Sequence, residues 1–434
     1  MSVSFRNRSA GRFDWQASLS RRSSKSTFVL AQLALVAAVL IAPWVYARVQ
    51  PKLPTTPALR PEPRRIVAEY DEPTIVTDEQ LAMVLEKLRP RLRKSQPKIN
   101  YVDHALRFWG VGAKFDDPDC LSGEELRTLL TDQRAFAKAW GEKTRPLLDV
   151  RPTGVAVRVQ QGNATSSHVD HTVASLAETG TPLNFPIHTA AGATTYEAMV
   201  RQALLDFEMN QAEYEWTSLA LALLAVDGRP WYTAEGDRID FNRIADRLMR
   251  QQYIQGVCMG NHRLFSLTIL LRVDDETQIL TPTTRERVLE HLAGATQRLV
   301  SSQAAEGYWD QNWYNGAAPV EPGKLESPTA RRVLATGHAL EWWAMAPRDL
   351  HPPREVLVRA GQWLAREIER MDDANVEKNY TFLSHAGRSL ALWRGQTPPL
   401  TLAARTPSAP AAKLPDPRSA NRFETWEPRG RLWR

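Results

Sequence analysis

Cysteine is scarce in this chain of 434 residues, in which Cys120 and Cys258 are the only two. Two cysteines exclude a disulfide framework, so a stable fold must come from burial of apolar side chains. One bridge between the two thiols is compatible with an oxidising compartment. The length predicts one large core of about 330 residues with an appendage at each end.

Excess charge is also small, because the formal net charge is only +6 at pH 7. Much of that excess lies in the N-terminal 65 residues, where basic residues face few acids. The high pI of 9.3 is therefore no evidence for nucleic-acid binding, and we expect no nucleic-acid partner.

Charged residues are absent from Thr27 to Tyr46, a run of 20 residues, which is the length that a helix needs to cross the hydrocarbon core. Six basic residues precede this run against the single acid Asp14, so the positive-inside rule places the N-terminus in the cytoplasm. We expect a transmembrane signal-anchor at 27–47 that follows a cytoplasmic segment, 1–26. The chain would then be a single-pass membrane protein with a periplasmic or extracellular main domain. A cleaved signal peptide is the alternative.

The composition also predicts where the folded domain begins and ends. Residues 48–74 are rich in proline and are expected to form an extended linker. Residues 396–434 are dominated by proline, alanine and arginine without helical periodicity, and are expected to be a disordered tail. The domain between them is predicted to span 75–395.

A seven-residue pattern recurs within this domain. One copy lies in VDHTVASLA, Val169 to Ala177, and begins at His171. The residue before each copy is usually of a type that caps helix N-termini, such as Asp170 or Ser384, so each copy is predicted to begin a helix. The six copies begin at His104, His171, Tyr214, His262, His338 and His385.

An amphipathic segment precedes each copy, and together they make six helix pairs. Apolar residues recur in these segments at spacings of three and four. Six pairs of an amphipathic outer helix and a more apolar inner helix predict an all-α fold, the (α/α)6 toroid. The alternating stretch Thr153 to Gln160 is expected to be a small strand on a loop. The six outer segments are 78–94, 122–142, 195–209, 240–252, 284–302 and 354–371.

The repeat places five of the nine histidines at equivalent ends of inner helices, around one rim of a central cavity that is lined by histidine and aromatic rings. A helix N-terminus disfavours the imidazolium, so these rings are expected to be neutral, the form that ligates metals or accepts protons. The candidate catalytic residues are His104, His171, His262, His338, His385 and Glu341.

Three interpretations of these rings stay open at this point. Each ring can be structural and bonded to a neighbouring backbone carbonyl. Some rings can form a catalytic or sugar-binding pocket with the acids Glu341 and Asp310. Alternatively, a subset binds a metal, for which Cys258 and His262 are the candidate ligands because they lie one helical turn apart, and zinc is the expected ion.

The segment QAAEGYW, Gln303 to Trp309, fits the QxxxGxW pattern of the squalene and hopene cyclases, where it closes the end of an outer helix. With the six helix pairs, residues 75–395 resemble the α/α toroid superfamily of terpenoid cyclases and protein prenyltransferases. The resemblance implies the fold and a cavity for a hydrophobic small molecule. The acidic DxDD motif of the cyclases is absent from this chain. Protein prenyltransferases hold zinc with Asp, Cys and His, so the resemblance implies an analogous role for Cys258 and His262.

The expected location favours a different substrate class. Toroids of this shape also resemble polysaccharide lyases and hydrolases, which act on glycans outside the cell. The loop GYWDQNWYNG, Gly307 to Gly316, supplies aromatic rings for sugar stacking, with a packed aromatic plug as its alternative. A non-catalytic scaffold or binding protein of the cell envelope is the alternative for the whole chain. The candidate substrate-binding residues are Trp309, Asp310, Trp313, Tyr314 and Trp342.

Overall fold

The computed structural model describes residues 24–49, 55–211, 213–255, 257–318, 328–396 and 398. The chain divides into two compact units between Leu53 and Pro54. The first unit contains one described helix, α1 (Ser24–Val49), whose side chains from 28 to 42 are exposed. Over the described ranges, no helix combines the length and the apolar character that a membrane crossing requires. Most of the predicted cytoplasmic segment and nearly all of the predicted tail lie outside the described residues.

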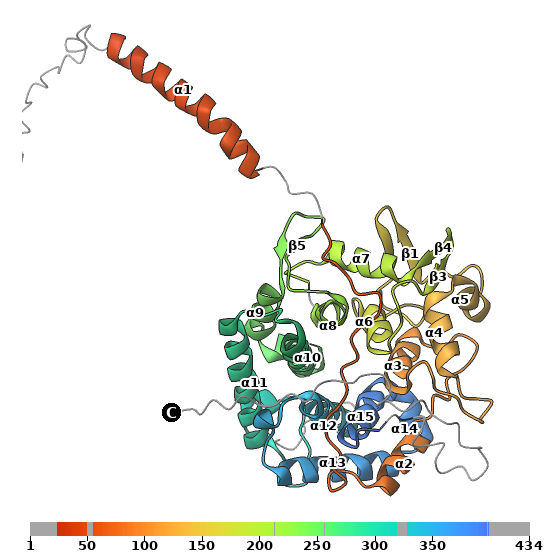
Figure 1. The fold of residues 1–434 in the computed structure, drawn as a ribbon. Coiled ribbons are helices and arrows are strands. Elements are labelled where there is room, and N and C mark those ends of the chain that lie inside the picture. Colours follow the sequence, from red (N-terminus) through yellow and green to blue (C-terminus); the bar gives the residue numbers. More distant parts are fainter. Residues whose placement is uncertain are drawn as a thin grey trace, which may run out of the picture. The chain divides into compact units, whose positions relative to one another are not determined.

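The second unit is mostly helical, which confirms the predicted all-α class (Figure 1). Six helices carry or directly follow the starting positions of the heptapeptides and are called the inner helices below. They are α3 (Ile99–Trp109), α6 (His171–Glu178), α8 (Glu215–Leu224), α10 (Asn261–Thr277), α12 (Pro328–Met345) and α15 (Tyr380–Trp393). The other helices are α2 (Asp78–Lys87), α4 (Gly123–Thr131), α5 (Gln133–Trp140), α7 (Tyr196–Asp206), α9 (Phe241–Arg250), α11 (Pro282–Ser302), α13 (Arg354–Arg370) and α14 (Asp373–Lys378).

The inner helices contact one another in chain order. Contacts join α3 to α6, α6 to α8, α8 to α10, α10 to α12 and α12 to α15, and α15 returns to contact α3. In Figure 1 these helices lie nearer the middle of the unit than α7, α9, α11, α13 and α2. Their residues are buried almost without interruption, which explains why their sequences lack a polar face.

Several of the surrounding helices begin at side-chain caps that the sequence encodes locally. Thr77 before α2 and Ser122 before α4 both form capping boxes, and Asp240 and Thr281 cap α9 and α11. The segment predicted as one helix over 122–142 is two helices, because Asp132 adopts an extended backbone and caps α5.

The QAAEGYW segment ends α11 and fastens it to α13. The Gln303 side-chain amide donates to the carbonyl oxygens of Gly307 at 3.0 Å and Val356 at 2.9 Å, and the Trp309 indole N–H donates to the Leu299 carbonyl at 2.7 Å. The bond to Leu299 satisfies a carbonyl in the last turn of α11, where the helix supplies no partner.

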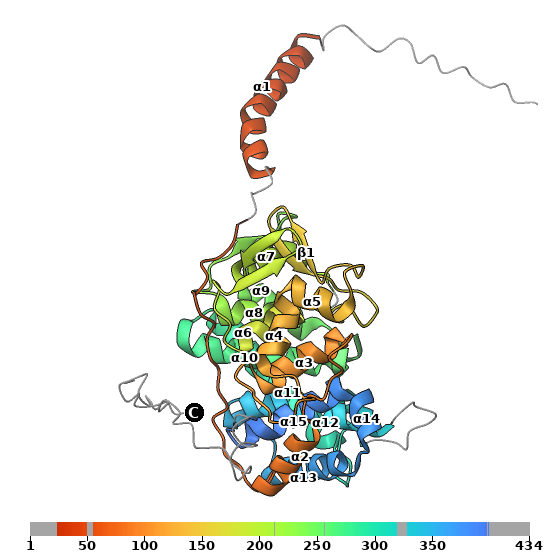
Figure 2. The same cartoon turned by 90° about the vertical axis from the view of Figure 1, so that its right-hand side faces the viewer.

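Three short antiparallel hairpins lie on the loops of the described second unit. They are β1 (Leu148–Arg151) with β2 (Gly154–Val157), β3 (Pro186–Thr189) with β4 (Gly192–Thr195), and β5 (Trp231–Tyr232) with β6 (Arg238–Ile239). Strand β2 lies within the stretch predicted as a strand, and the other two hairpins were not predicted. Figure 2 shows β1 and α7 at one end of this unit, with α2 and α13 at the other.

The predicted linker is part of the folded unit from Thr55 onward. The backbone amides of Arg60 and Arg64 donate to the carbonyls of Leu224 and Leu223, and Arg64 Nη1 donates to the Ala222 carbonyl. An extended, proline-rich segment has free backbone amides, and these pair with the last carbonyls of α8, which have no partner within their own helix. The expected boundary at 74/75 is therefore wrong, because residues 55–74 pack against the domain.

The heptapeptides do not all begin helices. His171 and His262 are the first and second residues of α6 and α10, and Tyr214 precedes α8. His104, His338 and His385 instead lie inside α3, α12 and α15, which begin several residues earlier. The prediction of six equivalent helix N-termini is therefore wrong for three copies, because apolar residues before the histidine continue each helix.

Candidate metal centre

One aromatic or imidazole ring from each inner helix meets its neighbour in a closed cycle. The cycle follows the order of the helices, and Trp216 takes the place of a histidine on α8. The ring centroids are separated by 4.4 Å for His104 and His171, 4.3 Å for His171 and Trp216, 4.5 Å for Trp216 and His262, 4.6 Å for His262 and His338, 4.0 Å for His338 and His385, and 5.2 Å for His385 and His104.

A further ring, His168, reaches this cycle from the loop before α6. Its centroid lies 5.8 Å from that of His171, 5.9 Å from His104 and 6.3 Å from His262. We call these six imidazoles the histidine cluster: His104, His168, His171, His262, His338 and His385.

The five predicted histidines are brought together but are not on an open rim. Each is between 1% and 4% exposed. The repeat therefore predicted their convergence, whereas the expected solvent-lined cavity at their position is not what the structure shows. Three of them lie well inside their helices, which places the rings within the core.

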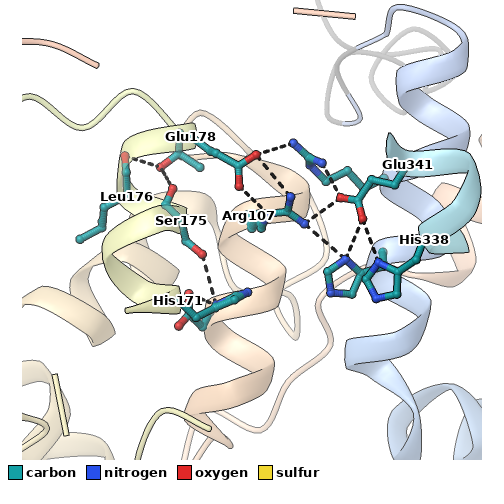
Figure 3. Close-up of polar contacts among 11 residues, drawn as sticks. Arg107, His171, Ser175, Leu176, Glu178, His338 and Glu341 are labelled. Carbon is teal, nitrogen blue, oxygen red and sulfur yellow. Dashed lines mark hydrogen bonds and ion pairs between the residues drawn. The ribbon is translucent and has the colours of Figure 1, made fainter. Parts of the chain in front are cut away.

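Glu341 orients two of the imidazoles. Its Oε2 atom lies 3.2 Å from Nδ1 of His338 and 3.0 Å from Nδ1 of His385 (Figure 3). A buried carboxylate requires donors, so we assign the proton of both rings to Nδ1, which leaves the lone pair on each Nε2. For His385 this assignment follows the shorter of two contacts, because Arg107 Nη1 also lies 3.3 Å from its Nδ1.

Two arginines hold Glu341 in its ionised form. Arg107 Nη1 donates to Glu341 Oε1 at 2.7 Å, and Arg388 Nη1 donates to the same oxygen. Both arginines also bond to Glu178, so two guanidinium groups and two carboxylates form one buried network (Figure 3). Burial alone would raise the pKa of Glu341, but Arg107, His385 and Arg388 lower it well below its usual range.

The other side of the cluster is oriented in the same way. His168 Nδ1 lies 2.8 Å from a carboxylate oxygen of Glu213, and His171 Nδ1 lies 3.0 Å from one of Asp103. His104 Nδ1 donates to a backbone carbonyl of its own helix, four residues earlier, at 2.8 Å. Four of the six imidazoles thus have a hydrogen-bond acceptor at Nδ1, and His171 lies within ion-pair distance of Asp103. Acceptors at Nδ1 are what fixes the tautomer of metal-ligating histidines.

Several ring nitrogens of the cluster are buried without a hydrogen-bond partner. They are Nε2 of His171, His338 and His385, and both Nδ1 and Nε2 of His262. Buried polar atoms are rarely left unpaired in folded proteins, because each costs about 1–3 kcal/mol. Five such nitrogens in one cluster make it a candidate site for a bound ligand.

The Sγ atom of Cys258 lies close to two of these imidazoles. A ligand atom from each of Cys258, His262 and His338 lies within 4.8 Å of the other two. The turn that carries the thiol is unusual, since Cys258 and Met259 both have positive φ angles, 52° and 56°. Left-handed backbone at non-glycine residues is strained and concentrates at functional sites. No disulfide joins the two cysteines, both of which are free.

Burial keeps the donor atoms in the protonation states that precede metal binding. Desolvation, followed by the neighbouring imidazoles, lowers the pKa of His262 and His385 well below the usual value. The lowered pKa values of these two rings favour the expected neutral form, with burial rather than a helix N-terminus as the cause. Desolvation raises the pKa of the Cys258 thiol, and a bound cation would reverse that shift by stabilising the thiolate.

The residues predicted to bind substrate are placed differently. Trp309, Trp313 and Trp342 are at most 1% exposed, so they offer no free face to a sugar ring, and the prediction of an aromatic platform is wrong for them. Trp313 packs on Tyr253 at 4.8 Å between ring centroids, as expected for an aromatic plug. Asp310 and Tyr314 are partly exposed, and Asp310 accepts from a backbone amide within its own loop.

Several residues of the site were missed from the sequence, although a signal for two of them exists. Arg107 and Arg388 occupy the fourth position of their heptapeptides, as the predicted Glu341 does, and a charge at that position of an apolar helix is conspicuous. Glu178 and His168 lie outside the repeat, so no periodic pattern pointed to them.

Comparison of the chain with protein families, with curated proteins and with solved structures finds no match.

Proposed function

We propose that this chain is a metal-binding protein whose inner helices enclose one transition-metal ion at Cys258, His262 and His338. The observation that carries the proposal is the set of buried, unpartnered ring nitrogens beside the Cys258 thiol, with Nδ1 of His338 turned toward Glu341.

The donor set fits zinc. Zn²⁺ is bound by thiolate and imidazole in tetrahedral sites, and three protein ligands leave one position for a further group. His385 has an unpartnered Nε2 and a ring 4.0 Å from that of His338, but its ligand atoms group with His338 and Glu341 rather than with Cys258. A bound ion supplies Lewis acidity and, through the thiolate, stabilisation of the fold.

Glu341 is assigned as an orienting carboxylate rather than a ligand. Its oxygen atoms also fall within ligand distance of His338 and His385. However, Arg107 and Arg388 both bond to Oε1, and two guanidinium groups oppose the approach of a cation to that carboxylate. The hydrogen bonds to Nδ1 instead raise the basicity of both rings.

We further propose that the second unit is an (α/α)6 toroid like those of the terpenoid cyclases and prenyltransferases. The closed order of contacts among the inner helices supports this, as does the cycle of six rings that follows the same order. A membrane anchor near α1 and an extracytoplasmic second unit follow from the charge-free run and the basic residues before it. Labelling of a Glu235→Cys variant by an impermeant thiol reagent in intact cells tests the location, and labelling only after permeabilisation would contradict it.

Metal analysis of the purified full chain tests the proposed centre. We expect about one zinc per chain. The Cys258→Ala, His262→Ala double variant should lose it, whereas Cys120→Ala, which removes the other thiol of the chain, should retain it. Equal metal content in wild type and the double variant, or none in either, would overturn the proposal.

A further inference from the structure

His168 differs from the rest of the histidine cluster in its access to solvent. Its side chain is 16% exposed, as is that of its partner Glu213, while the five other rings are at most 4% exposed. A metal that occupies a buried centre must reach it through some part of the surface. Within the described residues, His168 is the one ring of the cluster that reaches water to this extent.

His168 also lies beside the proposed ligands, of which Cys258 is itself partly exposed. Its ring centroid lies 6.3 Å from that of His262, so a cation held by His168 is about one ligand exchange away from the centre. Glu213 fixes His168 through Nδ1 at 2.8 Å, which leaves Nε2 as the nitrogen that can bind a cation.

A further carboxyl group, that of Glu215, lies inward from this pair, and burial raises its pKa to about 7. Glu215, the first residue of α8, is 1% exposed and has no hydrogen-bond partner for either carboxylate oxygen. Glu213 and Glu215 both act electrostatically on the Cys258 thiol. A buried carboxylate without hydrogen bonds is costly unless it has a function, and transient coordination of a cation would satisfy it.

We propose that His168 and Glu213 form a loading site for a divalent transition-metal cation, and that Glu215 passes the cation from this site to Cys258 and His262. This inference rests on the proposed metal centre. The two sites have different roles. The loading site determines the rate of metal binding, and the affinity is determined by Cys258, His262 and His338.

Stopped-flow mixing of the metal-free full chain with Co²⁺ separates these roles, because thiolate-to-cobalt absorption reports arrival at Cys258. We expect His168→Gln and Glu213→Gln each to slow loading by about tenfold or more, since local charge and ligands raise cation association rates. The cobalt bound per chain at equilibrium should be unchanged. His188→Gln is the matched control, because His188 also lies beside a carboxylate, 3.4 Å from Asp132, but belongs to the β3 hairpin.

Each alternative outcome has a distinct meaning. Wild-type loading rates in both His168→Gln and Glu213→Gln would overturn the loading site and leave the metal centre intact. Loss of bound cobalt at equilibrium in His168→Gln would also overturn it, because His168 would then be a ligand. Absence of thiolate-to-cobalt absorption in the wild-type chain would remove the metal centre and the loading site together.

Discussion

The Oε2 atom of Glu341 lies 3.0 Å from Nδ1 of His385, although the two residues are 44 positions apart and belong to different helices, α12 and α15. The same oxygen lies 3.2 Å from Nδ1 of His338. One carboxylate therefore sets the tautomer of two imidazoles at once, and the metal-binding nitrogens of both rings depend on it.

Replacement of that carboxylate should weaken metal binding. We expect Glu341→Gln to lower zinc affinity by about 10-fold to 100-fold, because outer carboxylates of metal-bound histidines contribute that much. The measurement is zinc competition with a chromophoric chelator. Glu178→Gln is the control, since Glu178 bonds to the same two arginines but to no imidazole. Both variants should lose stability, by about 3–5 kcal/mol, because each leaves buried guanidinium charge uncompensated. Equal losses of zinc affinity in the two variants would contradict the orienting role.

Zinc should stabilise the folded chain through Cys258. At a free zinc concentration of 100 times Kd, the free energy of unfolding should rise by about 2.7 kcal/mol, because the ion binds the folded state preferentially. Thermal unfolding of wild type with zinc and with excess chelator measures this difference. The shift should vanish in Cys258→Ala and persist in Cys120→Ala. A shift of the same size in Cys258→Ala would show that zinc acts elsewhere.

A side chain should not be tolerated at position 307, in the segment that follows α11. The φ of Gly307 is +111°, and a Cβ atom there would lie 2.5 Å from the carbonyl oxygen of Arg359. We expect Gly307→Ala to destabilise the chain by about 1–3 kcal/mol, because both the backbone strain and the clash oppose it. Denaturant unfolding provides the measurement. Gly294→Ala, in the interior of α11 with nothing within 4 Å of a Cβ, should instead stabilise by about 0.5–1 kcal/mol. Similar effects at the two sites would refute the close-approach argument.

Asp170 should oppose folding at neutral pH. Desolvation raises its pKa to about 6 from an ordinary value of 3.8, while Thr217 Oγ1 donates to it at 2.6 Å. Because the folded state holds the proton more tightly, the penalty is absent below pH 3.8, grows as the pH rises and is complete above pH 6. Asp170→Asn keeps the acceptor for Thr217 and removes the charge, so it should stabilise by about 2 kcal/mol at pH 7 and by little at pH 4.

The matched control for this pH dependence is Asp132→Asn. The hydrogen bond from the Arg134 side chain lowers the pKa of Asp132, so its contribution to stability is present at neutral pH and is lost on acidification. Asp132→Asn should therefore destabilise at pH 7, the opposite sign to Asp170→Asn. Unfolding free energies from about pH 2 to pH 8 give both curves, because the contribution of Asp132 is lost only below its unfolded pKa of 3.8. A stabilisation by Asp170→Asn that does not vary with pH would argue against ionisation as its cause.

Much of the helical arrangement could be predicted because its signals are local. The caps Thr77, Ser122 and Asp240 and the spacing of apolar residues place the starts of the surrounding helices to within a few residues, whereas the predicted helix 78–94 ends at Lys87. The heptapeptide register also predicted that His104, His171, His262, His338 and His385 converge, since equivalent positions of a repeat come together when its helices pack side by side.

The sequence by itself thus determined the all-α class, the inner helices and the five registered histidines, because propensity, capping and hydrophobic period act over a few residues. Only the tertiary structure decided that the rings are buried, that Glu341 serves both His338 and His385, and that His168 and Glu178 join them. These relationships connect residues tens to hundreds of positions apart. How deeply each helix extends past its histidine and which side chains then meet depend on packing between helices, which no local pattern records.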